Sequence, residues 1–176
     1  MNLREEILKE HSKRQAVKIG NWIGNNPARF KELMELFLHD EYRVTQRAAW
    51  IISYCGDNHP KLIMPWLKEM LKKTQEPGVH NAVRRNVIRV LAGIEIPKPL
   101  AGLAMGICFD ELSSPKSPIA VKVHAMSVLA NLSKHEPDIK GELQATIELL
   151  MKTGVPALIA RGRKVLKQIA KIQNKQ

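Results

Sequence analysis

Apolar residues recur along this chain at the spacing of one helix face, and the whole pattern repeats five times. The first position of the pattern falls at Ser12, Val44, Val83, Val121 and Ile159. The positions four, seven and eleven residues further on are mostly apolar or small, with a break at Arg163. Offsets of 0, 4, 7 and 11 share one side of an α-helix. The pattern therefore predicts five amphipathic helices at a regular period.

Turn-forming residues separate these helices from one another. A proline follows each of the first four at a similar distance, where it can open the next helix without losing a hydrogen bond; these are Pro27, Pro60, Pro97 and Pro137. No segment alternates apolar and polar residues for long enough to predict a sheet. Each repeat is therefore predicted to be a helical hairpin, with a first helix and the patterned second helix, buried by stacking on its neighbours.

Two stretches carry a family resemblance, V-R-R-N-V-I-R-V-L-A-G-I from Val83 and V-K-V-H-A-M-S-V-L-A-N-L from Val121. Both resemble the second helix of HEAT repeats, with a valine, a basic residue, a small residue and a leucine pair. The resemblance covers nearly the whole chain and implies an all-α fold, a right-handed α-α superhelix (solenoid) of about five hairpins. We expect one domain over residues 1–176, with repeats at 1–26, 27–58, 59–96, 97–135 and 136–176.

Charge is divided unevenly between the two helices of each predicted hairpin. The chain has 28 Lys and Arg against 17 Asp and Glu, a net charge of +11. The expected second helices contain no Asp or Glu; they cover residues 12–24, 43–56, 79–94, 119–133 and 155–172. In HEAT solenoids the second helices line the concave surface, so the resemblance implies a basic groove for an anionic partner. The alternative is that these cations brace neighbouring hairpins and keep the chain soluble.

Aromatic rings and cations are interleaved at the positions predicted to face this groove. Such a surface suits stacking on nucleic-acid bases or gripping the side chains of a protein. The alternative is that the rings fill the space between repeats. The predicted binding residues of the concave face are Arg14, Lys18, Trp22, Arg47, Trp50, Tyr54, Arg85, Asn86, Arg89, His124 and Arg161.

These features predict a non-catalytic binding module or scaffold whose partner is an acidic protein surface or a nucleic acid. The rival function is DNA repair, because the HEAT-like DNA alkylation-repair glycosylases resemble this chain in their basic groove and tryptophans. Their catalytic aspartate has no counterpart at the groove positions, and Asp57, the nearest acid, is interpreted as a helix-end turn residue. The hexapeptide S-S-P-K-S-P at residues 113–118 is similar to a lyase-superfamily signature, but it falls where a repeat needs its loop. We therefore expect no catalytic residues.

The remaining sequence features do not favour a metal site, a cofactor site or a membrane span. Cys55 and Cys108 lie in apolar stretches, which favours buried free thiols in a reducing cytoplasm. The histidines lack zinc-site spacing and no Gly-rich phosphate loop occurs, so neither a metal nor a small-molecule cofactor is expected. Gly102 and Gly106 are expected to permit close helix packing. The apolar run at residues 100–109 is about half the length of a membrane span, and we expect a cytoplasmic monomer.

Overall fold

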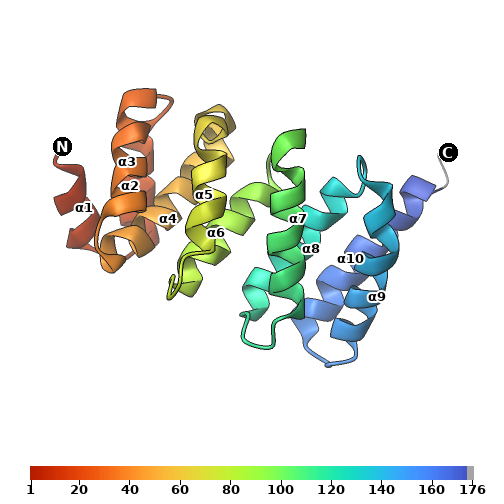
Figure 1. The fold of residues 1–176 in the computed structure, drawn as a ribbon. Coiled ribbons are helices and arrows are strands. Elements are labelled where there is room, and N and C mark those ends of the chain that lie inside the picture. Colours follow the sequence, from red (N-terminus) through yellow and green to blue (C-terminus); the bar gives the residue numbers. More distant parts are fainter. Residues whose placement is uncertain (174–176) are drawn as a thin grey trace. The chain divides into compact units, whose positions relative to one another are not determined.

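The computed structural model describes residues 1–173, and all regular structure within them is helical. Within each of two parts of the chain, consecutive helices pair as hairpins that pack in sequence order, as the repeats of a solenoid do (Figure 1). The predicted all-α solenoid is confirmed. The contacts divide the chain into two compact parts, Met1–Ile94 and Glu95–Gln176, which we call unit 1 and unit 2. The organisation of all five repeats as one domain stays a prediction.

Unit 1 contains three hairpins. Their helices are α1 (Leu3–Lys9) with α2 (Lys13–Ile23), α3 (Pro27–His39) with α4 (Tyr42–Asn58), and α5 (Leu67–Thr74) with α6 (Asn81–Ala92). Two short 3-10 turns precede α5, η1 (Pro60–Leu62) and η2 (Met64–Trp66). The second helices form the closest-packed layer, with α4 lying between α2 and α6. The first helices α1, α3 and α5 contact one another in sequence order.

Local chemistry explains where the helices of unit 1 begin and end. The Ser12 hydroxyl accepts a hydrogen bond from the backbone N–H of Gln15, which caps α2. The Asn26 side chain caps α3 in the same way, and Pro27 occupies the first helical position. Gly24 ends α2 with a φ of 52°, in the region that favours glycine.

Unit 2 contains two hairpins and a third 3-10 turn. Its elements are α7 (Lys98–Ser113), α8 (Ile119–Leu132), η3 (Pro137–Ile139), α9 (Lys140–Met151) and α10 (Pro156–Gln173). Helix α8 packs against α7 on one side and α10 on the other, and α9 packs on α10. The expected fifth repeat extends to residue 176, so its last three residues lie outside the described part of the chain.

The predicted inward-facing rows are confirmed in the second, third and fourth repeats with one exception, the half-buried Ile94. In the first, every row position but Ser12 is buried. In the last helix, the repeat row anchored at Ile159 was wrong by one residue. Helix α10 buries the face that starts one residue before Ile159; its members are Leu158, Gly162, Val165 and Ile169. This register places Gly162 at offset four, so the break at Arg163 disappears.

Candidate functional site

Three residues of α4 share its exposed side, at spacings of three and four: Arg47, Trp50 and Tyr54, which we call the α4 stripe. All three are half-buried. The Arg47 guanidinium donates to the carbonyl oxygens of Ile7 at 3.0 Å and Leu8 at 2.9 Å. Carbonyls in the last turn of a helix have no partner within it, so Arg47 completes the hydrogen bonding at the end of α1. The arginine is thereby held in one orientation.

Both rings of the α4 stripe are also held by neighbours. The Trp50 ring meets the His11 ring edge to face, with 5.6 Å between the centroids and 81° between the planes. The Tyr54 hydroxyl donates to the Asn21 side-chain oxygen at 2.7 Å. Its ring lies so close to Gly20 that a Cβ there would stand 2.3 Å from Tyr54 Cδ1. The rings therefore fill part of the space between neighbouring repeats, which was the alternative to a binding role, and they also stay partly exposed.

The predicted cations of α2 each have a carboxylate partner. Arg14 pairs with Glu10 at 3.2 Å and Lys18 pairs with Glu6 at 2.9 Å. Hydrogen bonds from Lys9, Lys18 and Gln15 lower the pKa of Glu6 from 4.5 to about 2. These ion pairs tie the start of α2 and its middle to α1 and to the linker after it.

Trp22, the third predicted residue of this helix, is half-buried in its last turn. The Arg29 guanidinium of α3 lies over its ring, 4.5 Å from the centroid. This cation–π contact joins the end of the first hairpin to the start of the second, so one side of the ring already has a cationic partner.

On α6, Arg89 bridges to α4. Its guanidinium donates to the Ser53 hydroxyl and to the Asp57 carboxylate, the latter at 2.6 Å. The expectation that second helices carry no carboxylate is wrong at Asp57. Helix α4 continues through Asn58, so Asp57 lies in its last turn and not in the connecting loop. There it neutralises Arg89.

The other two predicted residues of α6 differ completely in exposure. Arg85 is exposed, and within residues 1–173 its guanidinium makes no hydrogen bond or ion pair. Asn86 does not lie on the surface: its side chain is 4% exposed and donates to the Ala82 carbonyl oxygen at 2.8 Å. Position 86 therefore belongs to the packing between helices.

Unit 2 carries the last two predicted residues, both half-buried, with His124 on α8 and Arg161 on α10. Arg161 donates to the Ser127 hydroxyl of α8 at 3.0 Å. About two turns further along α10, Gln168 donates to the Asn131 side-chain oxygen at 3.3 Å. Arg161 thus joins neighbouring second helices in the same manner as Arg89 does in unit 1.

Comparison with known families agrees with this architecture. A family model described as a HEAT repeat domain matches residues 3–169. The chain belongs to the HEAT repeat domain family. No curated protein and no solved structure matched it. HEAT repeats are helical scaffolds that generally mediate protein interactions without catalysis, and this chain has the helical architecture of that family. Nothing in the comparisons favours the DNA-repair alternative.

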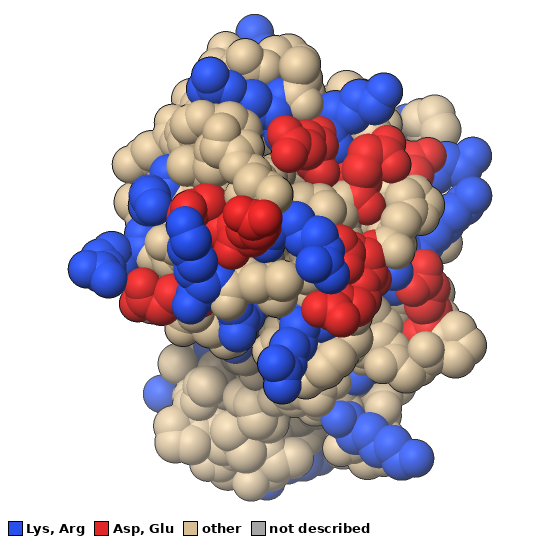
Figure 2. Space-filling model, turned by 90° about the vertical axis from the view of Figure 1, so that its left-hand side faces the viewer, with Lys and Arg blue, Asp and Glu red and all other residues tan. Residues whose placement is uncertain are grey.

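Acidic and basic groups are intermixed at the amino-terminal end of this HEAT domain. Arg4 pairs with Asp40 at 2.7 Å and lies 3.5 Å from Glu41, and Lys9 pairs with Glu6. Figure 2, which views the left-hand side of Figure 1, shows Lys and Arg side chains interspersed with Asp and Glu over that face. A uniformly basic field does not cover this face, even though the net charge is +11.

Sequence reasoning did not predict which small polar residues accept hydrogen bonds from the side chains of the next repeat. Ser53 and Asn21 lie at offset nine of their second helices and Ser127 at offset six. Each accepts a hydrogen bond from a side chain of the following second helix. A sequence signal for these contacts existed: in each case a small polar residue on one second helix is matched by an arginine or a tyrosine on the next. The contacts favour the bracing role that the sequence left open for these cations.

The two cysteines and the S-S-P-K-S-P loop take part in the packing of this HEAT domain. Cys55 and Cys108 are free and buried, and burial raises the pKa of each thiol to about 12. Ser117 of the S-S-P-K-S-P loop is buried and donates to Glu111, while Lys122 donates to the Leu112 carbonyl at 2.8 Å. Residues 1–173 contain no cluster of three or more potential metal ligands. No helix described is both long and apolar enough to cross a membrane.

Proposed function

We propose that this HEAT domain is a non-catalytic scaffold that holds an acidic protein on the exposed side of α2, α4 and α6. The α4 stripe carries the proposal. Tryptophan, tyrosine and arginine dominate the energetics of protein interfaces, and here they occupy successive turns of one helix. Ile7, Leu8, His11 and Asn21 already hold these side chains in place. Binding of a partner therefore costs little side-chain conformational entropy.

The charges on the same surface favour a protein over a nucleic acid. Arg14, Lys18 and Arg89 are each neutralised by a carboxylate, so a phosphate backbone would have to compete with an existing ion pair at every one. The exposed Arg85 has no such competitor. One unpaired arginine on α6, the helix that packs against α4 with its fixed aromatic rings, suits an acidic side chain within a largely apolar contact.

The experiment is a selection of displayed random peptides against the full chain, followed by affinity measurement of the enriched peptides on variants. We expect enrichment of Asp and Glu together with apolar residues. Arg85→Glu should weaken the enriched peptides about tenfold, and Trp50→Ala by at least as much, since each removes a group of hot-spot type. Lys152→Glu is the control, because Lys152 is an exposed cation in the turn before α10 of unit 2.

Fluorescence polarisation with single- and double-stranded DNA and RNA completes the test. Tighter binding of a nucleic acid than of any selected peptide, with a steep salt dependence, would replace the protein partner with a polyanion. Equal losses for Arg85→Glu and Lys152→Glu would mean that net charge alone attracts the peptides, which would contradict a site on α4 and α6.

A further inference from the structure

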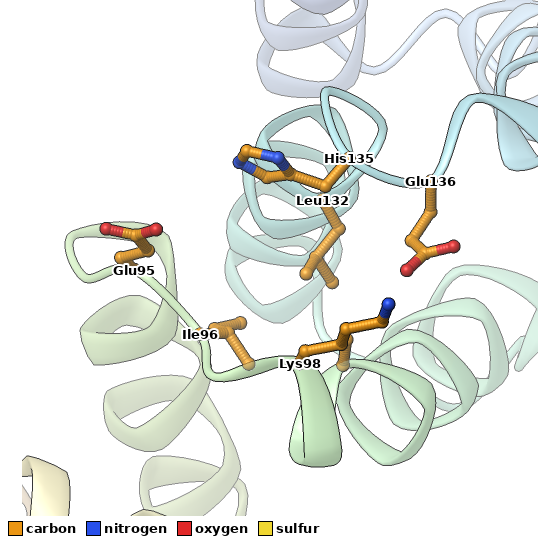
Figure 3. A pocket seen from close by; sticks show the side chains of 7 residues that line it. Glu95, Ile96, Lys98, Leu132, His135 and Glu136 are labelled. Carbon is orange, nitrogen blue, oxygen red and sulfur yellow. The ribbon is translucent and has the colours of Figure 1, made fainter.

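Unit 2 has a cavity of about 370 Å³ at the place where α7 begins and α8 ends. All the residues around it belong to unit 2, and Figure 3 shows their side chains, labelled except for Ala101; they are Glu95, Ile96, Lys98, Ala101, Leu132, His135 and Glu136. None of them was predicted from the sequence to belong to a binding site. The cavity lies in a different unit from the α4 stripe.

The turn after α8 forms one wall and is fixed by its own backbone. The Leu132 carbonyl oxygen accepts hydrogen bonds from the N–H of His135 at 3.0 Å and of Glu136 at 2.9 Å. On the opposite wall the chain enters α7, where the Leu100 N–H donates to the Pro97 carbonyl at 2.8 Å. Both walls are therefore built from hydrogen-bonded turns, which fix the backbone on two sides of the cavity.

Charged groups surround an apolar floor in this cavity. Ala101 and Leu132 are only 5% and 6% exposed. Glu95 and Glu136 stand on opposite sides of Leu132, and the Lys98 side chain extends toward the side of Glu136 (Figure 3). Within the described residues, the ionisable side chains here make no hydrogen bond or ion pair. Two carboxylates thus remain available on either side of an apolar surface.

We propose that this cavity binds one cationic side chain of a protein partner, with arginine as the best fit. Arginine has an aliphatic stem that can lie on Leu132, Ile96 and Ala101 and a planar group that can donate to carboxylates on two sides. Bonds between a guanidinium and carboxylates are among the stronger hydrogen bonds in proteins. An anionic ligand would meet two carboxylates for each lysine, so the charge balance disfavours it.

Substitution of Lys98 is expected to change the affinity for a cation in the opposite direction to substitution of a carboxylate. Its ammonium group is a cation at the edge of the cavity, so it repels an incoming guanidinium and competes with it for Glu136. Removal of that charge should strengthen binding of a cation, whereas removal of either carboxylate should weaken it. A site with a purely structural role would not respond in opposite directions to these changes.

The experiment titrates the full, isotope-labelled chain with Nα-acetyl-arginine methylamide and follows amide and methyl chemical shifts at about pH 8, above the usual titration range of histidine. We expect saturable shifts at Ile96, Ala101 and Leu132. Relative to the unmodified chain, Glu136→Gln should weaken binding about threefold, and Lys98→Met should strengthen it about threefold, in the range of one partly exposed ion pair. Glu142→Gln is the control, because Glu142 is an exposed acid of α9 outside the cavity.

The probes separate charge from shape. The lysine and norleucine analogues are titrated under the same conditions, and we expect arginine to bind best and the uncharged norleucine worst. Equal affinity for norleucine, absence of saturable shifts at the cavity, or weaker binding by Lys98→Met would each overturn the proposal. These results are independent of the peptide selection on unit 1, so failure at one site leaves the other intact.

Discussion

Individual glycines of this HEAT domain differ in whether a neighbouring side chain leaves room for a Cβ. A Cβ at Gly20 would lie 2.3 and 2.7 Å from ring atoms of Tyr54, closer than side chains can approach. Gly102 was expected to permit close helix packing, together with Gly106, but both are exposed and a Cβ at either would meet nothing within 4 Å. Within residues 1–173, close packing therefore explains Gly20 and not these two.

This difference predicts opposite effects for the same substitution. Gly20→Ala should destabilise the fold by about 1–3 kcal/mol, because the Tyr54 ring must leave its place on α2. Gly102→Ala should stabilise it by about 0.5–1 kcal/mol, because alanine is the better helix former and the site is open. Chemical denaturation of the two variants and the unmodified chain measures both changes.

The contact with Tyr54 can be isolated by a double substitution. In a Tyr54→Ala background the ring is gone, so Gly20→Ala should lose most of its cost or become stabilising. A cost that persists in this background would show that the tyrosine ring is not the cause.

At the scale of helices, the buried faces could be predicted because burial follows the 3.6-residue period. The prediction slipped in α10 because Leu158 and Ile159 are adjacent apolar residues, and only the choice between Gly162 and Arg163 four residues later distinguishes the two registers. Small residues occupy that row in the first and second repeats, at Ala16 and Ala48. Comparison with these repeats therefore favours Gly162, and with it the register that starts at Leu158.

The end of α4 and the partners of the cations could not be predicted in the same way. Gly56 looks like a helix-terminating glycine, but the helix continues through it to Asn58, and a Cβ at Gly56 would make only ordinary contacts with Val90 and Ile63. Asp57 is thereby carried to within 2.6 Å of Arg89. Whether a cation faces a solvent-exposed groove or a neighbouring helix depends on the distance between helices, which the sequence period does not contain.

The docking of α1 depends on the nearly buried Glu6, and its lowered pKa gives a prediction for acid. A carboxyl whose folded-state pKa falls from 4.5 to about 2 stabilises the fold above about pH 4.5 and loses this contribution as the pH drops toward 2. The cause is hydrogen bonding from Lys9 first, then from Lys18 and Gln15. We expect Glu6→Gln to lower the Tm at pH 6 and to reduce the fall in Tm between pH 5 and about 2.5.

Glu5→Gln is the matched control, because Glu5 is an exposed acid on the same helix. Thermal unfolding followed by circular dichroism across this pH range compares the three proteins. If Glu6→Gln keeps the full acid dependence of the unmodified chain, protonation of Glu6 does not contribute to it.

At the scale of the whole molecule, the two units differ in how many hairpins share a core. In unit 1, α4 is covered on both sides by second helices, α2 and α6, and its buried residues include Val44, Ala48 and Ile52. In unit 2, α8 and α10 make one such contact between second helices. Because a hairpin cannot bury its apolar face alone, about three repeats are needed for a stable stack.

The fragment of residues 1–94, with three hairpins, is therefore expected to fold by itself and to unfold cooperatively. The fragment of residues 95–176, with two, should unfold at a lower temperature over a broader range, because it has only one interface between hairpins to offset the loss of chain entropy. Circular dichroism melts of both fragments and of the full chain measure this difference. A more stable carboxy-terminal fragment would show that the α7–α8 and α8–α10 contacts, and not the number of repeats, determine stability, and it would make unit 2 the part of the chain that keeps its cavity when isolated.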